Sequence, residues 1–141
     1  MRGVTLPELM MVMALIAIAT AIGIRPMGHA LDRAAVDEGA ERYGAVHETA
    51  RAFAIARGRQ SRVELDSALR QATISLRRTS SQWDTMEVRA LGGAAFTASR
   101  IIVTFSPMGI GYGASNTSIV FSAGMAAETL TVSRTGRLKR N

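Results

Sequence analysis

Few residues in this 141-residue sequence have the types and spacing that catalysis or metal binding requires. His29 and His47 lie on an expected charged helix, outside any HExxH or histidine–carboxylate cluster, and we interpret them as surface histidines. Asp84 and Glu87 could suggest a pair of catalytic acids, but beside Trp83 in an expected strand we predict that they face solvent. The absence of cysteine excludes a disulfide framework, a thiolate zinc site and a cysteine nucleophile. The sequence therefore predicts no enzyme, no metal site and no cofactor.

The glycine-rich segment Gly109–Gly113 has the composition of a phosphate-binding loop. It lacks the Lys-Ser/Thr pair that follows such a loop, and no helical pattern begins after it. We expect a hairpin loop before Ser118, with Tyr112 exposed and able to meet a partner.

One carboxylate, Glu8, is the only charge in the apolar run Val4–Ile24. As a helix these 21 residues would extend ~31 Å, which matches a bilayer core of ~30 Å. A buried soluble helix and a signal peptide ending at Ala19-Thr20-Ala21 are the alternatives. We favour a retained membrane helix, because an ionisable group in such a segment costs several kcal/mol unless it is paired and therefore indicates function.

The residues around Glu8 suggest its partner. Gly3-Val4-Thr5-Leu6-Pro7-Glu8-Leu9 resembles the type IV prepilin signature, with glutamate fifth after the cleavage point. The resemblance implies that a prepilin peptidase and methyltransferase removes residues 1–3 by cutting after Gly3 and N-methylates Val4. It also implies a bacterial inner-membrane protein with a single span and a periplasmic head. Glu8 would neutralise the Val4 amine of a neighbouring subunit, since two charges in lipid are tolerated only as a pair.

The next segment, residues 25–58, has the pattern of an amphipathic helix. Pro26 is expected to kink or interrupt the chain after the apolar run. One helical face then carries Val36, Tyr43, Val46, Ala50 and Phe53, and Gly58 is a helix stop. The simplest interpretation is one long helix, with one half in the membrane and the other packed against a head.

From residue 59 to 141 the period of the sequence changes towards two, which indicates strands. The expected strands are Ser61–Asp66, Ala72–Arg78, Trp83–Arg89, Arg100–Ser106, Ser118–Ser122 and Thr129–Ser133. We predict an α+β protein in which a small, mostly antiparallel sheet packs on the helix.

Three head segments add to the resemblance. Ala50–Leu65, Ile101–Gly109 and Leu130–Arg140, in that order, are similar to the GspH/FimT family of minor pseudopilins. That family implies a structural subunit near the tip of a type II secretion pseudopilus, with other pseudopilins and secreted proteins as partners. Glu8 argues against the outermost tip position, because the outermost subunit usually lacks this glutamate.

The basic C-terminal segment leaves a second function open. The net charge of +6 resides in residues 59–141, and four cations occur within seven residues: Arg134, Arg137, Lys139 and Arg140. In the FimT branch a Gly-Arg-x-Arg element carries DNA binding for natural transformation, which Gly136-Arg137-Leu138-Lys139 matches except that Lys139 replaces an arginine. The alternatives are a solvated basic terminus, or a last strand whose Arg137 is paired within the head.

Overall fold

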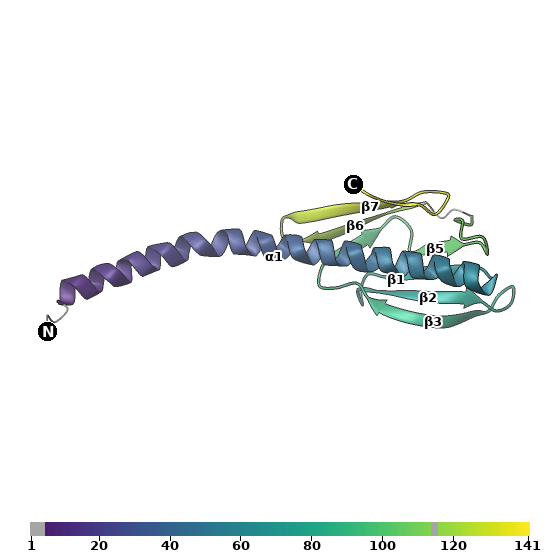
Figure 1. Cartoon of the computed structure of the whole chain (residues 1–141), viewed down its shortest axis with the longest axis horizontal. Coiled ribbons are helices and arrows are strands. Elements are labelled where there is room, and N and C mark those ends of the chain that lie inside the picture. The colour runs from purple at the N-terminus through teal and green to yellow at the C-terminus, as the bar shows by residue number, and fades with distance from the viewer. Residues whose placement is uncertain (1–4, 114–115) are drawn as a thin grey trace.

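A single long helix organises the molecule (Figure 1). The structure is a computed structural model that describes residues 5–113 and 116–141, with the backbone alone described at 21–26. Helix α1 (Leu6–Arg57) has 52 residues and begins directly before Pro7, whose fixed φ suits a first helical turn. It ends at Gly58, which adopts a left-handed conformation with φ 58°. The amides of Gly58 and Arg59 donate to the carbonyls of the last helical turn and thereby cap it.

The helix continues through position 26, so the expected interruption at Pro26 is wrong. Figure 1 shows a smoothly curved axis instead of a sharp corner in this part of the helix. A proline removes one backbone hydrogen bond, and a helix of this length can absorb that loss by bending.

Only the second half of α1 packs against the head. The predicted apolar face is confirmed, because Val36, Tyr43, Val46 and Ala50 have no exposed surface and Phe53 packs against the same core. Gly39 lies on this face, where an added Cβ would be 2.7 Å from the Phe121 ring. A glycine at this position therefore lets the helix backbone approach the sheet closely.

Two four-stranded antiparallel sheets form the head, where the sequence analysis expected one. The first has the order β3-β2-β1-β5 and the second has the order β4-β6-β7-β8. The strands are β1 (Ser61–Asp66), β2 (Gln71–Arg77), β3 (Trp83–Ala90), β4 (Ala95–Ala98), β5 (Ile102–Phe105), β6 (Thr117–Ala123), β7 (Ala126–Val132) and β8 (Leu138–Arg140).

All six expected strands are present, with ends shifted by up to three residues, whereas β4 and β8 were missed. Both are short edge strands of the second sheet, and their sequences carry little alternation of apolar and polar residues. Tertiary pairing with β6 and β7 determines them instead.

The core lies between α1 and the two sheets. Helix α1 contacts β1, β2 and β5 of the first sheet and β6 and β7 of the second. The largest fully buried side chains of this core include Ile74 and Phe105 from the first sheet, Phe121 and Leu130 from the second, and Tyr43 from the helix. This shared core fixes one half of α1 and leaves the other half projecting from the head (Figure 1).

Candidate functional site

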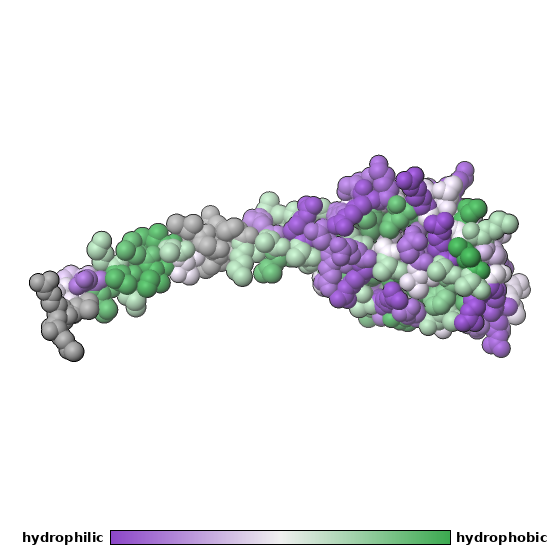
Figure 2. All heavy atoms as spheres, viewed as in Figure 1, coloured by the Kyte–Doolittle hydropathy of each residue, from purple (hydrophilic) through white to green (hydrophobic). Residues whose placement is uncertain are grey.

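The projecting half of α1 is apolar and uncovered. The described large apolar side chains of this half are between 48% and 74% exposed: Leu6, Leu9, Met10, Met11, Val12, Met13, Leu15, Ile16 and Ile18. Figure 2 shows this apolar surface away from the head. A continuous exposed apolar surface of this kind indicates contact with lipid or with other proteins.

Within the part of the chain that the structure describes, no helix is both long and apolar enough to cross a membrane. This finding does not include the whole of the expected membrane segment Val4–Ile24. Val4 and the side chains of residues 21–24 lie outside the described part of the chain.

Glu8 lies in the first turn of α1. A carboxylate there is favourable because the helix N-terminus carries a partial positive charge. Glu8 is exposed and takes part in none of the ion pairs among the described residues. The predicted processing residues, Gly3 and Val4, lie outside the described residues.

The end of the basic C-terminal segment forms strand β8, the last-strand alternative of the sequence analysis. Its pairing with β7 aligns Leu138 with Val132, Lys139 with Thr131 and Arg140 with Leu130. Before it, the turn that contains Arg134 is closed by Gly136, which donates its amide to the Ser133 carbonyl, and by the Arg137 amide, which donates to Ser133 Oγ at 3.0 Å.

The four predicted cations do not form one cluster. Arg140 turns towards the helix, where its Nη2 donates to Asp37 Oδ1 at 2.6 Å and to Glu128 Oε2 at 2.8 Å, while its Nε donates to Glu128 Oε1. The Glu128 side chain is only 7% exposed, so Arg140 neutralises a buried carboxylate. The expected internal pairing therefore involves Arg140 and not Arg137.

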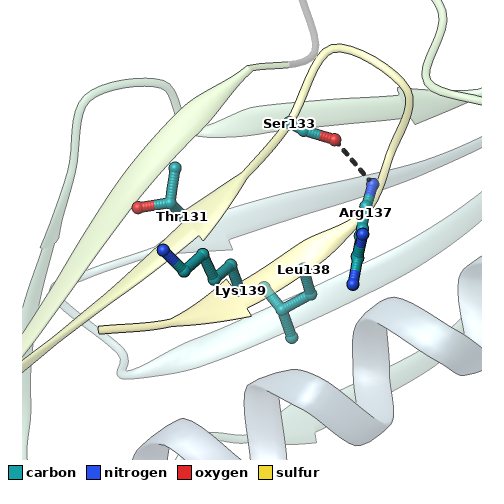
Figure 3. A pocket seen from close by; sticks show the side chains of 5 residues that line it. All are labelled: Thr131, Ser133, Arg137, Leu138 and Lys139. Atoms are coloured by element: carbon teal, nitrogen blue, oxygen red, sulfur yellow. Dashed lines mark hydrogen bonds between the residues drawn. The ribbon is translucent and has the colours of Figure 1, made fainter.

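Arg137 and Lys139 instead line a shallow pocket of about 400 Å³ beside Thr131, Ser133 and Leu138 (Figure 3). Both side chains are exposed. This pair could contact an anion, whereas Arg140 is held by two acids of the head.

His47 is fully buried, so its interpretation as a surface histidine is wrong. Its Nε2 lies 2.9 Å from the Gly136 carbonyl oxygen, and because a carbonyl only accepts, Nε2 carries the proton. The ring meets the edge of Phe105 at a centroid distance of 4.9 Å. His47 therefore ties α1 to the turn that precedes β8. Its spacing was a usable signal, since it follows Tyr43 by four residues and precedes Ala50 by three on the buried face.

Burial lowers the pKa of His47 from its ordinary value. The hydrogen bond to the Gly136 carbonyl and the charge of Glu48 oppose this shift, and the charge of Arg51 adds to it. The Nδ1 atom is buried without a hydrogen-bond partner among the described residues, and so is Tyr43 Oη. A proton on Nδ1 would therefore be a buried, unpaired donor.

Acid is expected to destabilise the head through His47. Because the folded-state pKa is depressed, the unfolded chain binds the proton more readily once the pH falls below about 6.5. The stabilisation is complete above that pH and is lost as the pH falls from there to the folded-state pKa, by up to about 1.4 kcal/mol per pH unit. Denaturant unfolding of a fragment from residue 28 onward, at a series of pH values, measures this slope. His47→Gln keeps an N–H donor without a titrating ring and should flatten it, and an unchanged slope would exclude His47 as its source.

The remaining candidates are exposed or partly exposed. Asp84 and Glu87 are partly exposed and pair with Arg78 at 3.7 Å and Arg89 at 2.6 Å. His29 is exposed, as predicted, and so is Tyr112 in the loop after β5. Among the residues that the structure describes, no group of three or more histidine, aspartate or glutamate side chains is placed to hold a metal ion.

A long N-terminal helix, half projecting and half packed on antiparallel sheets, is the type IV pilin-like fold, and this chain has that fold. A solved structure of the type IV minor pilin FimU of Pseudomonas aeruginosa matches with a TM-score of 0.62 and 17% identity, over 75% of this chain and 87% of that one. The minor pseudopilin EpsH from the type 2 secretion system of Vibrio cholerae matches with a TM-score of 0.62 and 13% identity, over 76% and 96%. No family model and no curated protein sequence matches the chain.

Proposed function

We propose that this chain is a minor structural subunit of a pilin-like filament and not an enzyme. The observation that carries the proposal is the projecting half of α1, whose apolar side chains are exposed along its described length. A soluble monomer would leave this surface in water at a large cost in free energy. Lipid covers it before assembly, and the helices of neighbouring subunits cover it in the filament.

Assembly then follows from the helix. Subunits leave the bacterial inner membrane, with their heads in the periplasm, and helix–helix contacts replace helix–lipid contacts. Glu8 neutralises the amine that cleavage after Gly3 creates on Val4 of a neighbour. The partners are other pilins or pseudopilins and the prepilin peptidase and methyltransferase.

Within this class we propose a place near the tip of a type II secretion pseudopilus, where the subunit supports export of folded proteins. The fold shared with EpsH fits this system, and FimU of a type IV pilus shares that fold with the same TM-score of 0.62. Comparison of secretion in cells with and without this subunit tests it, since secreted proteins should accumulate in the periplasm of the deletion strain.

Mass spectrometry of the protein from membranes tests the processing step. We expect residues 1–3 to be absent and Val4 to begin the mature chain with an N-methyl group. The unprocessed chain should accumulate when the peptidase is removed. A mature chain that begins at Ile22 would contradict the proposal and support a cleaved signal peptide.

A second candidate function is DNA capture by a minor pilin of a type IV pilus. Arg137 and Lys139, exposed beside the same pocket, favour it, because two adjacent cations can follow a phosphate backbone. Arg134 on the preceding turn belongs to the same segment. Arg140 is excluded from this role by its pairing with Glu128 and Asp37.

Duplex DNA binding over a salt series tests this candidate. Replacing Arg137 and Lys139 with alanine should weaken binding for all sequences and reduce the salt slope by about two. Arg57→Ala with Arg59→Ala is the matched control, because it removes the same charge from another surface and should change binding little. An equal loss of DNA affinity in both double variants would show that only the net charge matters, and it would exclude DNA capture by Arg137 and Lys139.

A further inference from the structure

The turn 133–137 leads to the two exposed cations of the shallow pocket, because Arg137 ends it and Lys139 follows two residues later. We propose that His47 positions this turn through Gly136, and that protonation of His47 opens the turn while the rest of the head stays folded. His47 therefore acts on Arg137 and Lys139 through the backbone. The inference rests on DNA capture, the second candidate function, for its effect on binding alone.

Two contacts fix the segment that contains these cations. At its end, Arg140 donates to Asp37 Oδ1 and to Glu128 Oε2. At its start, the Gly136 carbonyl accepts a hydrogen bond from His47 Nε2 at 2.9 Å. Strand β8, which lies between these contacts, is three residues long and has a short ladder with β7. The position of the segment therefore depends on both contacts.

Gly136 is closely packed against the surroundings of His47. It is buried and has a φ of 81°, a left-handed conformation that suits glycine. An added Cβ would be 3.0 Å from the Gly111 nitrogen and 3.1 Å from the Phe105 ring. The same Phe105 ring meets the His47 ring at a centroid distance of 4.9 Å. A change at the histidine is therefore transmitted to the turn, since a packed interior leaves little space to absorb it.

The hydrogen bonds described within the turn join its own residues. The Gly136 amide donates to the Ser133 carbonyl at 2.9 Å, and the Arg137 amide donates to Ser133 Oγ at 3.0 Å (Figure 3). These bonds preserve the shape of the turn but do not attach it to the helix. The hydrogen bond from His47 does attach it, because His47 belongs to α1.

A second proton on the His47 ring has no acceptor in the folded head. It would reside on Nδ1, which is buried without a hydrogen-bond partner among the described residues. Burial lowers the pKa of His47, and this effect exceeds the opposite effect of the Gly136 carbonyl. Opening of the turn lets water reach the charged ring. Four of the five turn residues are at least partly exposed, so this opening leaves the core in place and costs less than unfolding the head.

Charged groups near His47 come from the helix and from the turn. The titratable or charged residues within one helical turn of His47 on α1 and on the turn 133–137 are Tyr43, Glu48, Arg51, Arg134 and Arg137. Glu48 favours the charged imidazole and Arg51 opposes it. Burial raises the pKa of Tyr43, so its hydroxyl stays neutral, and arginines stay charged in acid. Strand β5 presents the uncharged Phe105. Histidine is thus the side chain here whose ordinary pKa lies nearest neutrality.

Hydrogen exchange of the full chain in detergent micelles, from about pH 7.5 to about pH 5, measures the opening of the turn. Exchange of the Gly136 and Arg137 amides, corrected for the intrinsic effect of pH, should rise by up to about tenfold for each pH unit below about 6.5. The amides of β1 and β2 should exchange more slowly throughout, because they open with the core. Exchange of the turn that is independent of pH, or that occurs only together with β1 and β2, would overturn the inference.

Substitutions at the two histidines separate titration from structure. His47→Gln keeps an N–H donor that does not titrate, so it should hold the turn at neutral pH and abolish the acid effect. His47→Leu removes the donor and should increase exchange of the turn about fivefold at neutral pH, the factor for one hydrogen bond. His29→Gln is the matched control, because His29 is exposed on the same helix. An acid effect that persists in His47→Gln would refute the role of His47.

Binding of duplex DNA to the full chain connects the turn with the second candidate function. Below about pH 6.5 the affinity of the unchanged protein should fall relative to that of His47→Gln, because an open turn no longer presents Arg137 and Lys139 together. Equal pH profiles of the two proteins would overturn the positioning of these cations by His47. Absence of binding at neutral pH would exclude DNA capture, and the exchange experiment would then decide the inference by itself.

Discussion

Glu8→Ala is expected to leave cleavage after Gly3 intact and to remove the subunit from filaments. In the proposed mechanism the peptidase acts on the bond after Gly3, and the glutamate acts later, when the Val4 amine of a neighbouring subunit enters an apolar environment. An unpaired cation in lipid-like surroundings costs about 3 kcal/mol, which corresponds to an incorporated fraction about 100-fold lower. The ratio of this chain in sheared filaments to that in membranes, determined by immunoblot, measures the effect.

Two controls separate charge from shape at this position. Glu8→Gln keeps the size of the side chain and removes its charge, so it should behave like Glu8→Ala. Glu8→Asp keeps the charge on a shorter side chain and should retain part of the incorporation. Normal incorporation of Glu8→Gln would refute the pairing and leave Glu8 as a favourable charge at a helix N-terminus.

Arg140→Ala is expected to lower the free energy of unfolding of the head by about 2 kcal/mol. The variant leaves the Glu128 carboxylate, which is 7% exposed, without its cation. Breaking a fully buried pair costs about 3–5 kcal/mol, and the loss is smaller here because the Arg140 side chain is 46% exposed. Denaturant unfolding of a fragment from residue 28 onward, which contains the core, measures the change.

Neighbouring cations supply the matched control. Arg137→Ala and Lys139→Ala remove exposed charges and should each change stability by less than about 0.5 kcal/mol. Adding Glu128→Gln to Arg140→Ala removes the uncompensated charge and should recover part of the loss. Equal effects of the three alanine variants would show that Arg140 is an ordinary surface cation.

The local pattern of the sequence predicted the helix and most strands. The apolar residues of α1 recur with helical spacing, and one face of a single element requires no knowledge of its partners. The same reasoning found β1 to its exact residues, because Val63 and Leu65 alternate with polar neighbours.

What sequence reasoning missed depends on contacts between distant parts of the chain. His47 was read by its residue type, although its spacing placed it on the buried face beside Tyr43. The role of Arg140 requires Glu128 and Asp37, which come from β7 and α1. Nothing in the run of basic residues distinguishes Arg140, which pairs with the buried Glu128, from Arg137 and Lys139 beside the pocket.

The contacts that His47 and Asp37 of α1 make with the C-terminal residues also affect the order in which the head folds. His47 meets Gly136 across 89 residues, and Asp37 meets Arg140 across 103 residues. Contacts of such sequence separation form late, because a long loop must close first. Because α1 is N-terminal, it is synthesised before β8, the strand that completes its contacts with the head. A chain that ends before Arg140 would carry the complete helix α1 but would lack the contacts of Arg140 with Asp37 and Glu128.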